Sequence, residues 1–222
     1  MSNGKSIMVD TSRCTACRGC QVACKQWNGL PGTKTKQIGT YQNPQDVSAE
    51  TWKLVRFSEG VRENGKPYWY FFSEQCRHCV EPPCAGMADN PAAIFKDKAT
   101  GAVIYTVKTK ALKAKEIIES CPYNIPRVGK DGILKKCTMC IDRITNNKVP
   151  ACVQSCPTGA MAFGDRDVIM EKVTKRVADL KKTYPQAVAL NPEDVRVIYI
   201  VTDDSKKYHE YAAAAVIPKN AA

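Results

Sequence analysis

The sequence feature that most constrains this chain is a run of closely spaced cysteines near its N-terminus. Cys14, Cys17, Cys20 and Cys24 are separated by two, two and three residues. Three thiolates at this spacing can bind one face of a cubane iron–sulfur cluster, while the fourth reaches a neighbouring cluster. Zinc sites usually come as separated pairs of ligands, and so compact a run cannot easily close on itself through disulfide geometry. The run therefore predicts iron–sulfur binding and requires a partner run elsewhere in the chain.

The cysteine count supports the same interpretation. The chain has 222 residues, 12 of them cysteines, and 44% are hydrophobic, which suffices for one large domain or two small ones. The cysteines gather in clumps and not at the intervals at which disulfides close loops, which favours metal binding. Because each [4Fe–4S] cluster takes four thiolates, the count matches three clusters with no thiol left over.

The second group of cysteines lacks part of the pattern. Cys76, Cys79 and Cys84 would be followed four positions later by another cysteine, but that position is Ala88, and Cys121 keeps only the last position of a further run. Three local thiols without a fourth and one remote thiol without partners are complementary, so we expect them to share one cluster. The ligand positions of the missing cluster all carry apolar side chains, which predicts a cluster site filled in by apolar packing. They are Ala88, Ala111, Ala114 and Ile117.

The last group, Cys137, Cys140, Cys152 and Cys156, repeats the pattern with a longer spacer before its third cysteine. In two-cluster ferredoxins the fourth cysteine of a run binds the cluster of the other run. The first and last groups therefore pair, and the second group is nested between them. The predicted ligand sets are Cys14, Cys17, Cys20 and Cys156; Cys24, Cys137, Cys140 and Cys152; and Cys76, Cys79, Cys84 and Cys121.

Residue patterns outside the cysteine groups predict regular structure. Two runs of β-branched and aromatic residues flank a turn-like stretch at 58–66, which is typical of a β-hairpin. An amphipathic pattern indicates a helix near the C-terminus, and an apolar run after it indicates a strand. The predicted strands are 5–9, 51–57, 67–72, 102–106 and 195–201, and the predicted helices are 109–120 and 167–184.

These elements predict an α+β fold with two ferredoxin-like iron–sulfur modules, one nested in the other, a β-hairpin insert and a helical C-terminal tail. The expected units are residues 1–32 and 131–165 for the two halves of the outer module, 33–72 for the β-rich insert, 73–130 for the inner module, and 166–222 for a tail that serves packing or partner contact.

Charge and hydropathy limit the classes of partner. The formal net charge of +11 would raise nucleic acid as a partner, but a [4Fe–4S] cluster with four thiolates carries −2, so three clusters would lower the net charge to about +5. We therefore expect no nucleic-acid binding. The sequence has no apolar span of 18 residues, and 1–13 has neither a twin-arginine pair nor an apolar signal core. We expect no membrane span and no export signal.

Several polar residues beside the cysteines leave two alternatives open. His78 lies between two predicted ligands, but because cysteines supply all four, we expect it to be a hydrogen-bond donor or a surface residue. Basic residues next to the ligands would raise a cluster's potential if they lie close to it, and solvated surface is an equally good interpretation. They are Arg18, Lys25, Arg77, Lys135 and Lys136. The sequence shows no nucleophile–base pair and no phosphate-binding loop, so we predict no catalytic residues.

The order of these motifs resembles the iron–sulfur electron-transfer subunits of molybdopterin oxidoreductases, the group that includes formate dehydrogenase, nitrate reductase and dimethyl sulfoxide reductase. The resemblance covers about residues 5 to 165. Many members have four clusters. With three clusters, and with the stretches 14–27 and 137–144, the chain is most similar to the small (beta) subunits of the soluble periplasmic tungsten or molybdenum formate dehydrogenases of sulfate-reducing bacteria.

The resemblance implies a heterodimer with a large catalytic subunit that binds molybdenum or tungsten through bis-pterin cofactors and interconverts formate and carbon dioxide. This chain would be the non-catalytic subunit that relays electrons to a redox partner such as a soluble multihaem cytochrome c. The resemblance implies a periplasmic location, reached by co-export with the catalytic subunit, and the alternative is cytoplasmic. Alternative functions are the same role in a nitrate, dimethyl sulfoxide or polysulfide reductase or, from another class, a structural zinc or disulfide protein.

Overall fold

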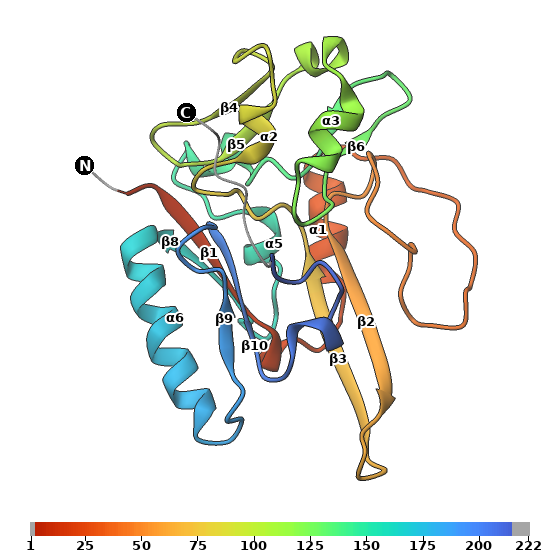
Figure 1. Ribbon diagram of the computed structural model, residues 1–222, viewed down its shortest axis with the longest axis vertical. Coiled ribbons are helices and arrows are strands. Elements are labelled where there is room, and N and C mark those ends of the chain that lie inside the picture. Colours follow the sequence, from red (N-terminus) through yellow and green to blue (C-terminus); the bar gives the residue numbers. More distant parts are fainter. Residues whose placement is uncertain (1–2, 215–222) are drawn as a thin grey trace.

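The computed structural model describes residues 3–214, which form a mixed α/β structure (Figure 1). The strands are β1 (Lys5–Asp10), β2 (Leu54–Val61), β3 (Pro67–Glu74), β4 (Ile94–Lys96), β5 (Val103–Tyr105), β6 (Arg127–Val128), β7 (Leu134–Lys135), β8 (Met161–Asp165), β9 (Val188–Leu190) and β10 (Val197–Val201). The helices are α1 (Gly19–Trp27), α2 (Pro83–Gly86), α3 (Ala114–Glu119), α4 (Ile141–Ile144), α5 (Ala151–Gln154) and α6 (Arg166–Lys181). Short 3-10 turns are Thr11–Arg13, Val107–Ala111 and Ser205–Lys207.

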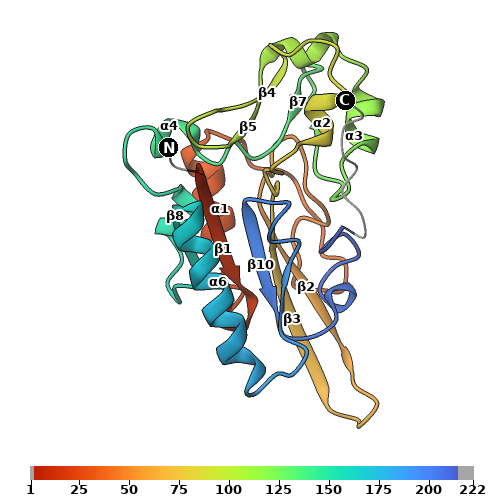
Figure 2. The same ribbon diagram turned by 60° about the vertical axis from the view of Figure 1, so that its left-hand side comes forward.

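The largest sheet has the strand order β8-β1-β10-β9 and joins the two ends of the described chain. β1 pairs in parallel with β10 and antiparallel with β8, so the sequence that leads into the first cysteine run lies between two late strands. Every residue of β10 is buried, as expected of an apolar strand covered on both faces. Helix α6 covers one of these faces, where Ile169 and Val173 pack in one cluster with Ile198 and Ile200 (Figures 1 and 2).

The described segment 166–214 therefore contributes to the core. It was predicted to be a helical tail for packing or partner contact, and the predicted helix and strand are both present as α6 and β10. What differs is their place: β10 is an inner strand of the largest sheet, and β9 forms one of its edges. Residues 215–222 of the predicted tail lie outside the described residues.

The predicted hairpin is confirmed as β2 and β3, which pair antiparallel and extend away from the sheet (Figure 2). Its turn covers only 62–66, because both strands continue further than the polar residues suggested. Aromatic side chains on β3 attach it to the C-terminal segment: Phe72 stacks on Tyr199 with ring centroids 4.3 Å apart, and Tyr70 stacks on Tyr208 at 4.4 Å. These contacts fix the end of β3, from which the second cysteine group continues.

The segment between the hairpin and the last cysteine group contains short elements only, α2, α3 and the strand pairs β4–β5 and β6–β7. The helix predicted at 109–120 is interrupted, because Leu112 has an extended backbone and separates a 3-10 turn from α3. A small apolar cluster holds these elements together, with Ile94, Val103, Ile117 and Leu134 fully buried in it.

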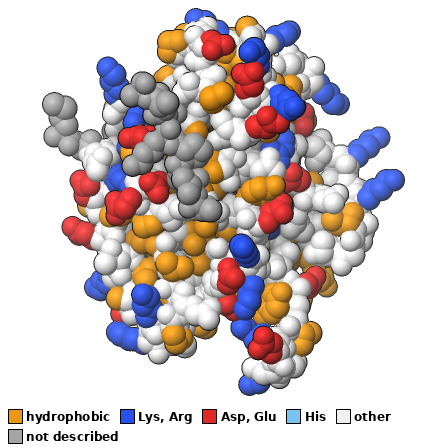
Figure 3. Space-filling model, viewed as in Figure 1, with side chains coloured by type: hydrophobic (Ala, Val, Ile, Leu, Met, Phe, Trp, Pro, Cys, Tyr) orange, Lys and Arg blue, Asp and Glu red, His pale blue; other side chains and the backbone are white. Residues whose placement is uncertain are grey.

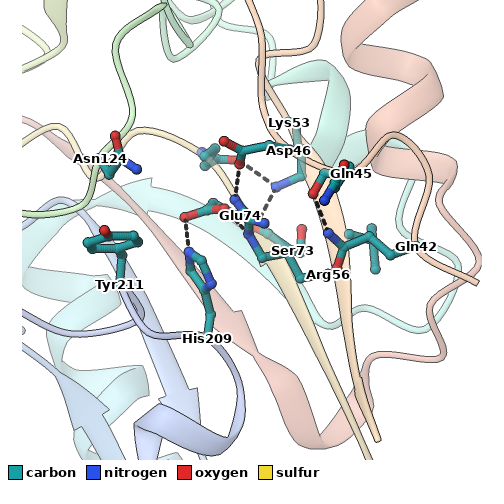
Figure 4. A network of polar contacts seen from close by, with 12 residues as sticks. Gln42, Gln45, Asp46, Lys53, Arg56, Ser73, Glu74, Asn124, His209 and Tyr211 are labelled. Atoms are coloured by element: carbon teal, nitrogen blue, oxygen red, sulfur yellow. Dashed lines mark hydrogen bonds and ion pairs between the residues drawn. The ribbon is translucent and has the colours of Figure 1, made fainter. Parts of the chain in front are cut away.

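A buried polar network ties the hairpin to its surroundings (Figure 4). The carboxylate of Glu74 on β3 contacts His209, at 3.2 Å, and Arg56 on β2. Arg56 also pairs with Asp46, and Asp46 pairs at 2.7 Å with Arg127. Because Glu74 is almost fully buried, loss of Arg56 would leave its charge poorly compensated. The network therefore fixes four segments around the end of β3.

Charged side chains are dispersed on the face of the molecule shown in Figure 3, where basic and acidic groups are interspersed among the described residues. Within residues 3–214, no helix combines the length and apolar character needed to cross a membrane.

Candidate metal centres

Each cysteine run has a left-handed backbone conformation at the same position, and Arg18 and Cys140 adopt it as well. Two positions after the first cysteine, Ala16, His78 and Met139 have φ angles of 54°, 48° and 57°. This conformation turns the backbone N–H of the residue back toward the preceding sulfur. His78 N donates to the Cys76 Sγ at 3.4 Å, Met139 N donates to the Cys137 Sγ at 3.3 Å, and Ala16 N makes the equivalent bond to Cys14.

The four cysteines of the second predicted set line one cavity of about 320 Å³. Cys24 comes from α1, Cys152 from α5, and Cys137 and Cys140 from the loop that leads into α4. Helices α1 and α5 pack against each other, which brings the end of the first run against the last group. The structure thus brings together a set of thiols that the sequence places far apart.

The four cysteines of the third predicted set line a second cavity of similar size, about 340 Å³. Cys76 and Cys79 lie in the loop after β3, Cys84 lies on α2, and Cys121 follows α3. The remote Cys121 therefore lies with the three clustered thiols, as the complementary gaps in the sequence predicted.

The first predicted set lies nearer the surface. Burial raises the pKa of Cys14, and the neighbouring thiols of Cys20 and Cys156 add to this effect. Cys17 is exposed and borders an open hollow that is also lined by aromatic side chains. The aromatic residues of this hollow are Tyr41, Phe57, Trp69 and Phe71.

The bonding and the pKa values of these thiols are consistent with cavities that bind a metal centre. All 12 cysteines are free of disulfides. Burial raises the pKa of Cys24 and of Cys121 to about 12 and that of Cys140 to about 11, so without a metal these thiols stay neutral. A bound metal centre reverses this balance, because coordination deprotonates a thiol. Among residues 3–214, no three His, Cys, Asp or Glu side chains are placed to hold a single metal ion.

A further donor supports the fit. The buried Nε2 of Gln75 lines the cavity of Cys24 and Cys137 and has no hydrogen-bond partner among the described residues. Amide groups that donate toward cluster sulfurs stabilise the reduced state of iron–sulfur centres. A cluster in this cavity would thus offer acceptors to an N–H group that the protein itself leaves unpaired.

The sequence left open whether His78 and the basic residues beside the cysteines are buried or lie on the surface, and the structure shows both cases. The Nδ1 of His78 accepts a hydrogen bond from Val103 N at 2.9 Å, and burial together with Lys136 and Arg196 keeps its pKa well below the usual range. His78 is thus a neutral hydrogen-bond acceptor. Arg77 and Lys136 are buried, whereas Lys135 is partly exposed and pairs with Asp131 at 2.7 Å.

Arg18 and Lys25 are anchored to the backbone, through Tyr41 O for Arg18 and through Pro31 O and Glu50 O for Lys25. Lys53, which was not among the predicted site residues, is buried and lines the cavity of the second set. Its place in an alternating strand-like segment gave no signal of this position.

The three sets are neighbours in a fixed order. Burial raises the pKa of Cys152, which Lys53 opposes, and the thiol of Cys20 in the first set adds to the increase. Burial likewise raises the pKa of Cys137 well above its usual value, with contributions from Cys24 and from Cys76 of the third set. The geometry agrees with this: Cys20 of the first set and Cys24 of the second lie on one helix, α1, and Lys136, which directly precedes Cys137, lines the cavity of the third set. The second set thus adjoins both of the others.

The positions of the absent fourth set are largely packed with apolar side chains. Ile117 is fully buried in the small apolar cluster of the inner segment, and Ala88 and Ala114 pack against it half-buried. Ala111 is exposed. Three of the four positions thus meet in one apolar cluster, in agreement with a filled-in site.

The folded arrangement defines the class of protein: cysteine groups distant in sequence converge on cavities suited to iron–sulfur clusters, on a mixed α/β scaffold. A sequence model described as a 4Fe-4S dicluster domain matches residues 67–166. The chain is 49% identical over 214 residues to "Formate dehydrogenase 2 subunit beta (cytochrome c-553)" of Nitratidesulfovibrio vulgaris, covering 94% of this chain and 98% of the relative. It is 51% identical over 214 residues to the formate dehydrogenase subunit beta of Megalodesulfovibrio gigas, covering 95% and 99%.

A more distant relative is the iron–sulfur subunit of the nitrate-inducible formate dehydrogenase of Escherichia coli K12. It is 38% identical over 209 residues, covering 91% of this chain and 70% of the relative. The chain belongs to the family of formate dehydrogenase beta, or iron–sulfur, subunits. This confirms the family expected from the cysteine motifs.

The left-handed residue of the first run provides a test of the loop geometry. A β-branched side chain is strongly disfavoured at a positive φ, so Ala16→Val should displace the N–H that bonds the Cys14 sulfur. We expect Ala16→Val to lose about four iron atoms, one [4Fe–4S] cluster, while Ala16→Gly, which tolerates this backbone, keeps them. Iron and acid-labile sulfide analysis of the purified proteins measures this. Equal iron in the two variants would contradict the proposed role of the loop.

Proposed function

We propose that this chain is the electron-transfer subunit of a formate dehydrogenase and binds three [4Fe–4S] clusters. The observation that carries the proposal is the convergence of two four-cysteine sets, each of which lines one cavity. The first cluster would be held by Cys14, Cys17, Cys20 and Cys156, the second by Cys24, Cys137, Cys140 and Cys152, and the third by Cys76, Cys79, Cys84 and Cys121. When bound, such clusters accept and release single electrons.

We also propose that the scaffold consists of two ferredoxin-like modules, one nested in the other. The packing of α1 on α5 supports this, because it places Cys24 among the thiols of the last group. The convergence of Cys121 with Cys76, Cys79 and Cys84 supports a separate inner module. The boundaries proposed from the sequence, 73–130 for the inner module and 131–165 for the second half of the outer one, fit these contacts.

The partner in this proposal is a large catalytic subunit that binds molybdenum or tungsten through bis-pterin cofactors and interconverts formate and carbon dioxide. The relatives from N. vulgaris and M. gigas are named as beta subunits, which supports a heterodimer. The N. vulgaris relative carries cytochrome c-553 in its name, which supports a c-type cytochrome as the redox partner, here a soluble multihaem cytochrome c. The same relay in another molybdopterin oxidoreductase is the alternative function.

The order of the three sites defines the two ends of the relay, and the exposed surface at one end supports a direction. The second site lies between the first and the third, so one end of the chain of sites is the Cys14 site and the other is the Cys79 site. We propose that electrons enter at the Cys14 site, where Cys17 is exposed beside an aromatic hollow on which a partner subunit can pack, and leave at the Cys79 site.

The cluster count gives the first test. We expect about twelve iron atoms per chain, because each of the three four-cysteine sets would hold four. Anaerobic metal analysis of the isolated subunit or of the heterodimer, corrected for the iron of the catalytic subunit, measures this number. A result of about sixteen, or of about eight with free thiols, would refute the assignment of ligands.

The direction of the relay gives the second test. In the purified heterodimer, Cys79→Ser should lower formate-dependent reduction of the cytochrome much more than reduction of a small artificial dye, because the dye can accept electrons before the last site. The two rates are measured separately, after the iron content shows that the complex is intact. Equal losses, or a selective loss of cytochrome reduction in Cys17→Ser instead, would reverse the proposed direction.

The location gives the third test. A subunit that reduces a c-type cytochrome must share its compartment, and we propose the periplasm, reached by co-export with the catalytic subunit. In cells that lack the twin-arginine signal of the catalytic subunit, we expect both subunits in the cytoplasmic fraction. If this chain still reached the periplasm in those cells, co-export would be wrong, and if both subunits of unaltered cells stayed in the cytoplasm, the cytoplasmic alternative would hold.

A further inference from the structure

Lys53 lies just before β2, and its side chain points into the interior between two of the cysteine sites. It is only 2% exposed. Its Nζ donates to Ser73 O at 3.3 Å (Figure 4). It also donates to the Oε1 of Gln75, and both acceptors are neutral. No ion pair involves Lys53 within residues 3–214, so its ammonium charge is left uncompensated by any carboxylate of this part of the chain.

The surroundings of Lys53 place it between the first and second sites. It lines the cavity of Cys24, Cys137, Cys140 and Cys152. On its other side, the hydroxyl of Ser73, whose carbonyl accepts from Lys53, lies 3.5 Å from the Cys20 sulfur. The ammonium group of Lys53 therefore lies between the Cys20 side of the first set and the cavity of the second set.

Lys136 occupies the equivalent place between the second and third sites. It is 4% exposed, and it directly precedes Cys137 of the second set while lining the cavity of the third set. Its Nζ donates to Val103 O at 2.6 Å and to Cys137 O at 3.0 Å, and it lies 4.6 Å from the centre of the Tyr105 ring. These partners are neutral as well, and no ion pair involves Lys136 among the described residues.

We propose that Lys53 and Lys136 set the reduction potentials of the clusters on either side of them, one buried ammonium group for each gap in the relay. This rests on the proposed three-cluster function and goes beyond it. A cluster that accepts an electron becomes more negative, and a nearby positive charge stabilises that state. Because both groups are buried, neither water nor salt screens the interaction as it would at the surface. Each lysine raises the potentials of two neighbouring sites together, so the step between them stays small.

The same residues could instead serve only to satisfy carbonyl groups, and the test separates the two roles. Lys53→Gln and Lys136→Gln keep an N–H donor and remove the charge, whereas Lys53→Arg and Lys136→Arg keep the charge. Lys135→Gln is the matched control, because Lys135 adjoins Lys136 in sequence but is partly exposed and paired with Asp131. The readout is the midpoint potential of each cluster, from redox titration followed by electron paramagnetic resonance in the purified heterodimer.

We expect each glutamine variant to lower the midpoint potentials of its two adjacent clusters by at least about 59 mV. For a one-electron couple this is a tenfold change in the reduction equilibrium. The arginine variants and Lys135→Gln should stay close to the unaltered protein. If Lys53→Gln loses iron, Lys136→Gln tests the same statement at the other gap. Unchanged potentials in a glutamine variant with full iron would overturn the proposal. Loss of iron from both glutamine variants would overturn it too, since the charges would then serve cluster retention.

Failure of this inference differs from failure of the proposed function. If the unaltered heterodimer lacks the iron and the resonance signals of three clusters in this subunit, the proposed function itself is wrong. If those signals are present and only the variants fail to shift, the function stands and the two lysines have another role.

Discussion

The packing of α1 against α5 is the contact on which the arrangement of the metal centres depends. It places Cys24, at the end of the first cysteine run, in a cavity with Cys152 and the two cysteines that precede α4. Gly19 at the start of α1 lies so close to Ser155 that an added Cβ would stand 3.2 Å from its carbonyl oxygen. The two helices can approach because this position carries no side chain. The first and last cysteine groups are therefore held together by one small interface.

Much of this organisation could be predicted from the sequence, because the spacing within one cysteine run indicates which distant cysteines lie beside it in the fold. The sets that line the two cavities were derived from gaps in that spacing, and the hairpin, α6 and β10 followed from local periodicity. The pairing of β1 with β10 could not be derived in this way. Parallel pairing between distant strands leaves no trace in the pattern of either strand alone, beyond the apolar run that makes β10 suitable for an inner position.

Lys53 escaped prediction for a related reason. A lysine in an alternating strand-like segment is expected on the solvent face, because burial of an ammonium group is costly. Here the hairpin leaves the sheet at that point, and the residues at the end of β3 offer Ser73 O and Gln75 Oε1 to the ammonium group. Where local propensity and tertiary structure disagree, a functional cause is common. The two cysteine sites on either side of Lys53 offer such a cause.

The position of β10 also bears on how the chain matures. Strand β1, which leads directly into Cys14, pairs on one side with β8 and on the other with β10. A ribosome delivers the N-terminal cysteines long before these two strands exist. The packing that places the first cysteine run beside the last group can therefore form only after most of the polypeptide has been synthesised. Until then the early thiols have no folded surroundings, and free thiols are open to oxidation.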